Sequence, residues 1–183
     1  MFGKNKNIKK LNSVLGLEIS ENSVVVVEVK FDKDSINILN GFRIDVPVFQ
    51  DINQTISLLN QNLKLLGIKT RQCAFAFTMQ YFKLFPVPIP KTIPQDEINS
   101  IIIQEGNIAP ETDTVSWLAL YNTQRVDPDG IERYDVLGIS ISNKILEASK
   151  IISESCGLKL TYLTPAFLCL GVFLPTKQSN TLI

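Results

Sequence analysis

The chain has 183 residues, of which 45% are hydrophobic and 20% are charged, an ordinary composition for a folded protein with one sizeable core or two smaller ones. Eighteen basic residues balance eighteen acidic ones, so composition gives no support for a nucleic-acid partner. There is no histidine, which removes the commonest general base and the commonest metal ligand together.

The three cysteines, Cys73, Cys156 and Cys169, are far apart and lie in apolar runs. Without a CxxC pair or a histidine, we expect no metal site. An odd number of widely spaced cysteines is typical of free, buried thiols in a reducing cytosol. The cysteines therefore predict a cytoplasmic protein.

The first ten residues, "MFGKNKNIKK", predict a basic flexible tail over residues 1–10. Its lysines are Lys4, Lys6, Lys9 and Lys10. An alternative is weak attraction of these lysines to an anionic membrane leaflet, which without an apolar anchor would not hold a protein there. Glutamates interrupt the apolar residues that follow, so we expect neither a signal peptide nor a membrane span.

Three strands are predicted next, over residues 11–20, 23–31 and 35–46, because apolar runs there are separated by polar turn residues. The first turn is "SENS", residues 20–23. The four consecutive valines Val24–Val27 predict a strand that is covered on both faces.

An amphipathic helix is predicted over residues 51–67, followed by a short buried strand, "QCAFAF", over 72–77. Asp51 and Gln54 form a plausible capping pair, and Gly67 is placed to end the helix. The apolar positions recur every three or four residues: Ile52, Ile56, Leu59, Leu63 and Leu66.

A second unit begins near Met79 with the strand "YFKLFPVPIP". Its prolines, Pro86, Pro88 and Pro90, exclude this strand from the centre of a sheet beyond Phe85, because proline cannot donate a ladder hydrogen bond. A helix is predicted from Pro94, since acidic residues fill the turn that follows.

The segments "TVSWLALYN" and "ERYDVLGISIS" predict a hairpin across the turn "DPDG", and a helix follows from about Ser142 to Gly157. The strand "LKLTYL" then leads into "AFLCLGVFL", a helix that is apolar all round. Such a helix requires burial on all sides, and little of the chain remains to cover it. The sequence therefore predicts the first half of a larger fold.

The common catalytic motifs are missing: there is no GxSxG, no phosphate-binding P-loop and no GxGxxG. Asp127 and Asp129 resemble a metal pair, but "DPDG" is an ordinary turn sequence with no third ligand nearby. We predict no catalytic residue and no metal ligand.

The opening strands resemble the start of the actin-like ATPases, whose first turn follows the pattern D-x-G-[ST]-x-[SN] and holds phosphate. The resemblance places Glu18 at the Asp position, Ser20 at the Gly position, and Glu21, Asn22 and Ser23 in the rest of a phosphate turn. Glu18 is longer than Asp, Ser20 lacks the freedom of Gly, and Glu21 adds a negative charge beside an anion site. A plain polar hairpin turn is the alternative interpretation.

Longer stretches resemble one branch of that superfamily, the PilM family of type IV pilus assembly proteins. The similar stretches are "MFGKNKNIKK" leading into "VLGLEI", "KLFPVPIPKTIPQDEINSIIIQEGNIAPETDTVSWLAL" and "VLGISISNKILEASKIISESCGLKLTYLTPAFLCL". The resemblance implies an α/β fold. Residues 11–78 and 158–183 would form half of an actin-like (ribonuclease H-like) core, and residues 79–157 an inserted small α+β subdomain shared with the division protein FtsA.

The function implied by the resemblance is that of a non-catalytic cytoplasmic platform at the inner face of the bacterial inner membrane. It would bind the cytoplasmic N-terminus of a PilN-like membrane protein, reach the membrane only through such partners, and bind no nucleic acid. ATP and Mg²⁺ would bind only where the second half of the fold is present, so none is expected for this chain alone.

Three alternatives stay open. Two have the same fold: an FtsA-like division protein and a cytoplasmic component of type II secretion. The third is an ATPase or sugar-kinase-like enzyme, which the missing glycine at Ser20 and the charge of Glu21 disfavour.

Overall fold

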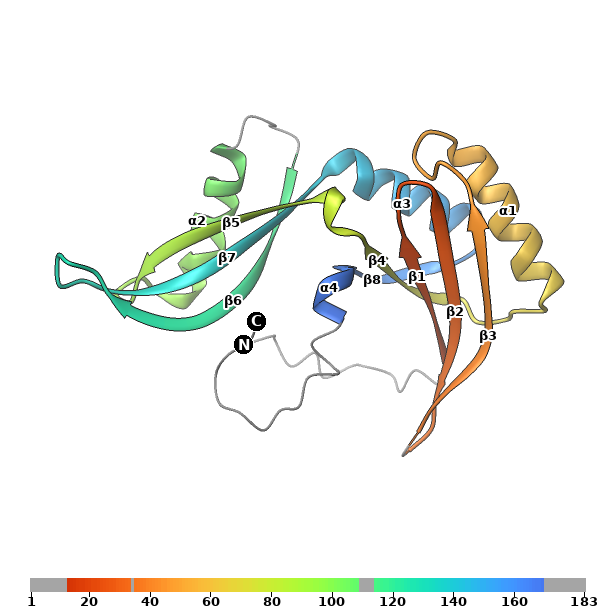
Figure 1. Ribbon diagram of the computed structural model, residues 1–183, viewed down its shortest axis with the longest axis horizontal. Coiled ribbons are helices and arrows are strands. Elements are labelled where there is room, and N and C mark those ends of the chain that lie inside the picture. Colours follow the sequence, from red (N-terminus) through yellow and green to blue (C-terminus); the bar gives the residue numbers. More distant parts are fainter. Residues whose placement is uncertain (1–12, 34, 109–113, 170–183) are drawn as a thin grey trace. The chain divides into compact units, whose positions relative to one another are not determined.

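The computed structural model describes residues 13–33, 35–108 and 114–169 (Figure 1). The chain forms two compact units. The first comprises residues up to Phe77 together with Ala148–Thr164, and the second comprises Thr78–Glu147 together with the residues from Pro165.

The first unit contains a five-stranded sheet in the order β3-β2-β1-β4-β8. β2 is antiparallel to both β1 and β3, whereas β1 and β4 are parallel, and α1 (Ile52–Leu65) connects β3 to β4. The strands are β1 (Ser13–Ile19), β2 (Ser23–Phe31), β3 (Ile36–Asp45), β4 (Gln72–Phe77) and β8 (Lys159–Pro165). The five strands and the first helix predicted for this unit are present, whereas the predicted basic tail over residues 1–10 lies outside the described residues.

The core of the first unit lies on one face of this sheet, because alternate residues of each strand point to the same side. Leu17 of β1 pairs with Phe75 of β4, and both are almost completely buried. On β2, Val24 and Val26 are buried but Val25 and Val27 are only half-buried. The valine run is therefore not covered on both faces as predicted, since only its alternate members enter the core.

The helix α3 (Asn143–Ser155) is divided between the units, and this corrects the predicted boundary at residues 157 and 158. Its second half packs in the first unit, where the Asn60 side-chain amide donates to the Ser155 carbonyl oxygen at 3.3 Å and the Cys156 thiol lies 3.9 Å from the Ile56 carbonyl oxygen. The first segment of the second unit consequently ends at Glu147 and not at residue 157. The described part of the final apolar segment, α4 (Ala166–Cys169), groups with the second unit and not with the predicted core half.

The second unit has a strand–helix–strand–strand order, after a short 3₁₀ turn, η1 (Met79–Tyr81). Its antiparallel sheet has the strand order β5-β7-β6, and α2 lies along one face (Figure 1). The elements are β5 (Phe82–Pro90), α2 (Gln95–Ile108), β6 (Thr114–Val126) and β7 (Glu132–Ser142). The residues buried between sheet and helix are Val87, Ile89, Ile98, Ile102 and Val136.

The three prolines of β5 all face the open edge of this sheet. Successive residues of an antiparallel strand direct their N–H groups to opposite edges. The Lys91 N–H donates to the Glu132 carbonyl oxygen on the β7 side at 2.9 Å, so the even-numbered Pro86, Pro88 and Pro90 face away from β7. The predicted exclusion of this strand from the sheet centre is confirmed, and its outer edge is a poor template for further pairing.

None of the helices in residues 13–33, 35–108 and 114–169 is both long enough and apolar enough to cross a membrane.

Candidate functional site

The turn between β1 and β2 is closed by its own two serines. Ile19 and Val24 form the last strand pair, and the Ser20 N–H donates to the Ser23 carbonyl oxygen at 3.0 Å. The two hydroxyl oxygens, Ser20 Oγ and Ser23 Oγ, lie 2.8 Å apart, and Ser20 Oγ also donates to the Ser23 carbonyl oxygen at 3.1 Å. Both serine hydroxyls and the Ser20 N–H are therefore already engaged within the turn.

The middle of the turn is bound to the segment that joins β3 to α1. The Val46 N–H donates to the Asn22 carbonyl oxygen at 2.9 Å, and the Val48 N–H donates to the Glu21 carbonyl oxygen at 3.1 Å. Both side chains, Glu21 and Asn22, remain exposed. The start of α1 is also occupied, because the Asp51 carboxylate accepts a hydrogen bond from the Gln54 N–H at 2.9 Å, the capping pair predicted from the sequence.

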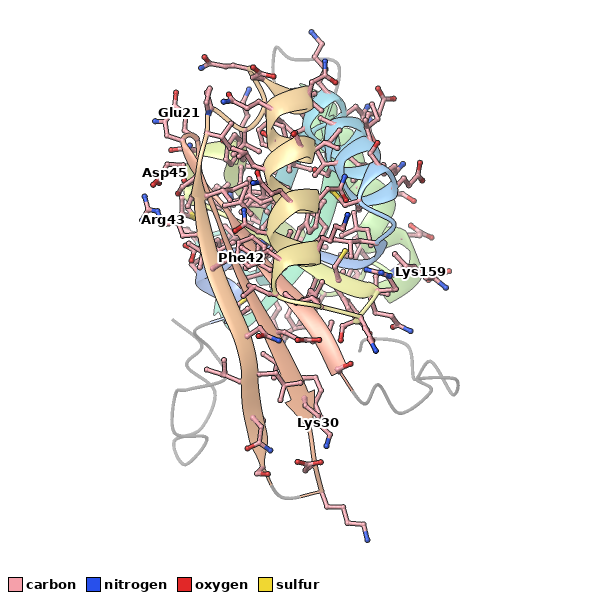
Figure 2. All side chains as sticks on the ribbon, turned by 90° about the vertical axis from the view of Figure 1, so that its right-hand side faces the viewer. Glu21, Lys30, Phe42, Arg43, Asp45 and Lys159 are labelled. Atoms are coloured by element: carbon pink, nitrogen blue, oxygen red, sulfur yellow. The ribbon has the colours of Figure 1, made fainter. Side chains whose placement is uncertain are left out.

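Carboxylates surround this turn. Glu18 is exposed on the face of β1 opposite to Leu17, and Asp45 of β3 pairs with Ser23. Figure 2 shows Glu21, Arg43 and Asp45 at this end of the unit. The Arg43 Nε group is 2.8 Å from the Asp45 carboxylate and thus already has an anionic partner.

The five predicted site residues, Glu18 and Ser20–Ser23, do lie together, but their arrangement does not fit a nucleotide phosphate. Engaged hydroxyls and nearby carboxylates oppose an anion, and the described positive-φ glycines are Gly67, Gly130 and Gly157, all outside the turn. No group of three metal-ligating side chains occurs among the described residues.

Asp127 and Asp129 lie in a turn, as the turn interpretation predicts, and one arginine side chain pairs with both carboxylates. The Gly130 N–H donates to the Asp127 carbonyl oxygen at 2.8 Å, and Gly130 has a φ of 80°. Arg133 forms ion pairs with both carboxylates, at 2.5 Å and 3.1 Å. The pKa of Asp129 is lowered, mainly by the hydrogen bond that its carboxylate accepts from the Ile131 N–H and then by Arg133. These carboxylates are used to close the turn.

A cavity of about 260 Å³ lies within the second unit, near the start of β5 and the junction of β7 with α3. Sequence reasoning missed it. Ser140, which is 2% exposed, was visible as a polar residue within the apolar run "LGISIS", and that was the only signal. The lining is mixed, with apolar and polar side chains from Gln80, Tyr81, Phe82, Lys83, Ser140, Ser142 and Ile145.

Solved structures with a similar fold identify what the chain resembles. One is a PilM–PilN type IV pilus biogenesis complex, with a TM-score of 0.71 and 18% identity over 87% of this chain and 49% of that one. Another is the cytoplasmic domain of EpsL, an inner-membrane component of the type II secretion system of Vibrio cholerae, with a TM-score of 0.59 and 11% identity over 84% of this chain and 57% of that one. The chain thus spans about half the length of these structures. No family model and no curated protein matches the sequence.

Proposed function

We propose that this protein, whose α/β fold is similar to that of PilM, is a non-catalytic assembly component of a type IV pilus machine. The observation that carries the proposal is that the likeness extends over 87% of the chain, and so includes both compact units. A likeness confined to the first sheet would be equally compatible with many enzymes.

We propose further that the partner is the cytoplasmic N-terminal peptide of a PilN-like inner-membrane protein, which would place the chain at the cytoplasmic face of that membrane. One solved structure with a similar fold is that of a PilM–PilN complex. The cavity of the second unit supports this proposal, because a hollow with Phe82 and Ile145 beside serine hydroxyls can accept one apolar side chain of an extended peptide.

Calorimetric titration with PilN-like N-terminal peptides tests this assignment. Ile145→Ala should weaken binding by about 1–2 kcal/mol if the cavity holds an anchor side chain. Ile151→Ala is the matched control on the same helix, since Ile151 is 50% exposed and does not line the cavity. Binding should change little between low and moderate salt, because the net charge is zero and apolar contacts dominate. Equal loss in both variants would contradict the proposed cavity.

The turn at residues 20–23 is proposed to be a degenerate phosphate turn, so that the chain neither binds nor hydrolyses ATP. Its engaged serines and its carboxylates support this proposal. We expect Glu18→Ala to leave peptide binding unchanged, because the turn lies in the first unit and the cavity in the second. ATP turnover above a protein-free blank, abolished by Glu18→Ala, would overturn the proposal.

A type II secretion component is the second candidate, favoured by the likeness to the EpsL cytoplasmic domain. The two candidates differ in the partner that they require. The chain should be titrated in parallel with peptides from pilus-type and secretion-type inner-membrane partners. Preference for the secretion-type peptides would replace the first proposal by the second.

A further inference from the structure

The charged side chains of the first unit are separated between its two ends. Glu21 and Asp45 lie at the end that carries the turn at residues 20–23, whereas Lys30 lies at the opposite end (Figure 2). Strand register and a hydrogen bond bring further basic residues to this second end: Ser13 pairs with Lys30, and the Ser13 hydroxyl is 2.8 Å from that of Thr70, the residue between Lys69 and Arg71.

We call this second end of the first unit the basic end. Its exposed cations are Lys30, Lys33, Lys64, Lys69 and Arg71. The acidic residues near these cations in the sequence are Glu28, which is buried, and Asp32 and Asp34. Asp32 is already engaged, since its carboxylate accepts a hydrogen bond from the Asn37 amide at 2.8 Å and lies 3.6 Å from Lys30 Nζ.

Exposed apolar side chains accompany these cations at the tip of the β2–β3 hairpin. Ile36 and Ile38 are 68% and 74% exposed, and Phe31 and Leu39 are exposed beside them. Phe31 pairs with Ile36 at the last strand position, and the Asp32 N–H donates to the Ser35 carbonyl oxygen at 2.9 Å. These apolar side chains are thus exposed on a hairpin whose backbone hydrogen bonds are formed. Leu65 and Leu66, also exposed, follow Lys64 where α1 ends.

We propose that the basic end docks on the surface of an anionic phospholipid bilayer. The hairpin tip would enter the boundary between headgroups and acyl chains, and the cations behind it would contact the headgroups. An apolar anchor combined with several cations is the combination that holds a peripheral protein on such a surface, whereas either alone binds weakly. A second copy of the chain fits this end poorly, because facing copies would bring two excess positive charges together. The proposal is independent of the PilN-like partner.

Sedimentation of the full chain with lipid vesicles tests the proposal. We expect binding to phosphatidylcholine vesicles that contain roughly one third phosphatidylglycerol, weak binding to phosphatidylcholine alone, and a decrease as salt is raised. The double variant Ile36→Thr/Ile38→Thr should lower the partition coefficient at least about tenfold, since it removes apolar surface at β-compatible positions. Val126→Thr is the matched control, because Val126 is a strand residue of the second unit that is 66% exposed.

A second variant pair keeps the test informative if the first unfolds, which thermal melting would reveal. Lys69→Gln/Arg71→Gln should reduce binding about fivefold for each cation removed, because both side chains are exposed and lie outside the core. The proposal is overturned by equal binding to both kinds of vesicle, by absence of binding, or by full binding of both double variants. It is also overturned if the chain self-associates without lipid and Ile36→Thr/Ile38→Thr abolishes that association, since the partner would then be a second copy.

Discussion

The two sheets of this molecule are stabilised in different ways. In the first unit, α1 and part of α3 accompany five strands, and Leu15, Val26, Phe75 and Phe77 have no measurable exposure. In the second unit, α2 covers three strands, and fit at particular points matters more. There the Phe85 ring lies directly over Gly138, and three prolines close an edge. We therefore expect substitutions in the first unit to lower the free energy of unfolding according to the buried volume that they remove. In the second unit, the loss should depend on the local fit between neighbouring side chains.

The largest effect should come from Phe75→Ala in the first unit. Phe75 is fully buried and makes an edge-to-face contact with Phe77, with ring centroids 6.2 Å apart. Loss of the ring should lower the free energy of unfolding by about 3–5 kcal/mol, because a cavity replaces it. Urea unfolding gives this value, and amide exchange should show protection lost in β1 and β4 but kept in β5 and β7.

Phe31→Ala is the control for the same chemical change, since Phe31 is 43% exposed. It should alter stability by no more than about 0.5 kcal/mol. Loss of amide protection across both units at once in Phe75→Ala would contradict the expectation that the two units unfold independently.

A buried carboxylate in the first unit should have the next largest effect. Glu28 is 6% exposed and accepts hydrogen bonds from the Asn40 amide and the Thr70 hydroxyl, both at 2.6 Å. Glu28→Ala leaves both donors without their acceptor and should cost about 2–3 kcal/mol in urea unfolding. Glu28→Gln keeps the shape and one acceptor, so its cost should be about half. Equal costs would mean that the negative charge, which both variants remove, determines the contribution of Glu28, and not its volume or the acceptor that glutamine retains.

Local sequence patterns predicted the elements well because each depends on neighbouring residues. Asp51 and Gln54 mark the start of α1, and the prolines of β5 mark a sheet edge. Pairing between distant segments was beyond such patterns. The sequence did not show that Glu28 would be buried against Thr70, or that α3 would be shared between the units.

The position of the turn followed from the strand pattern, but its hydrogen bonding did not. Residues 20–23 lie where β1 leads into β2, as the apolar runs on either side of "SENS" predicted. The mutual hydrogen bonding of Ser20 and Ser23 depends on side-chain geometry, which turn propensities do not specify. The cavity beside Ser140 requires β5, β7 and α3 together, and no single segment announces it.

In the second unit, Gly138→Ala tests local shape. A Cβ at Gly138 would come within 2.2 Å of the Phe85 ring, so the ring would have to move. We expect a loss of about 1–3 kcal/mol, with faster amide exchange confined to β5 and β7. Adding Phe85→Leu should recover part of the loss. Gly16→Ala is the matched strand control, because its nearest neighbour is the Val27 carbonyl oxygen at 3.9 Å. Equal losses at Gly138 and Gly16 would reveal an effect of strand glycines in general.

The smallest effect is a pH dependence that should belong to the first unit alone. Burial raises the pKa of Cys73 from 9.0 to about 12 and that of Cys156 from 9.0 to about 11, whereas the second unit's described cysteine, Cys169, is exposed. Unfolded thiols ionise near pH 9 while the folded ones stay protonated. Their contribution to stability is therefore complete below pH 9 and is lost as pH rises toward 11–12.

From about pH 8 to about pH 9.5, each buried thiol should lower the free energy of unfolding by about 1 kcal/mol. Urea unfolding at a series of pH values measures this slope, and Cys73→Ala/Cys156→Ala supplies the reference, since lysines and tyrosines titrate equally in both proteins. The variant has a lower stability at every pH because it also leaves cavities, but its pH slope should be the shallower one. Identical slopes would show that neither thiol remains protonated in the folded first unit, and hence that its core admits water near Cys73 and Cys156.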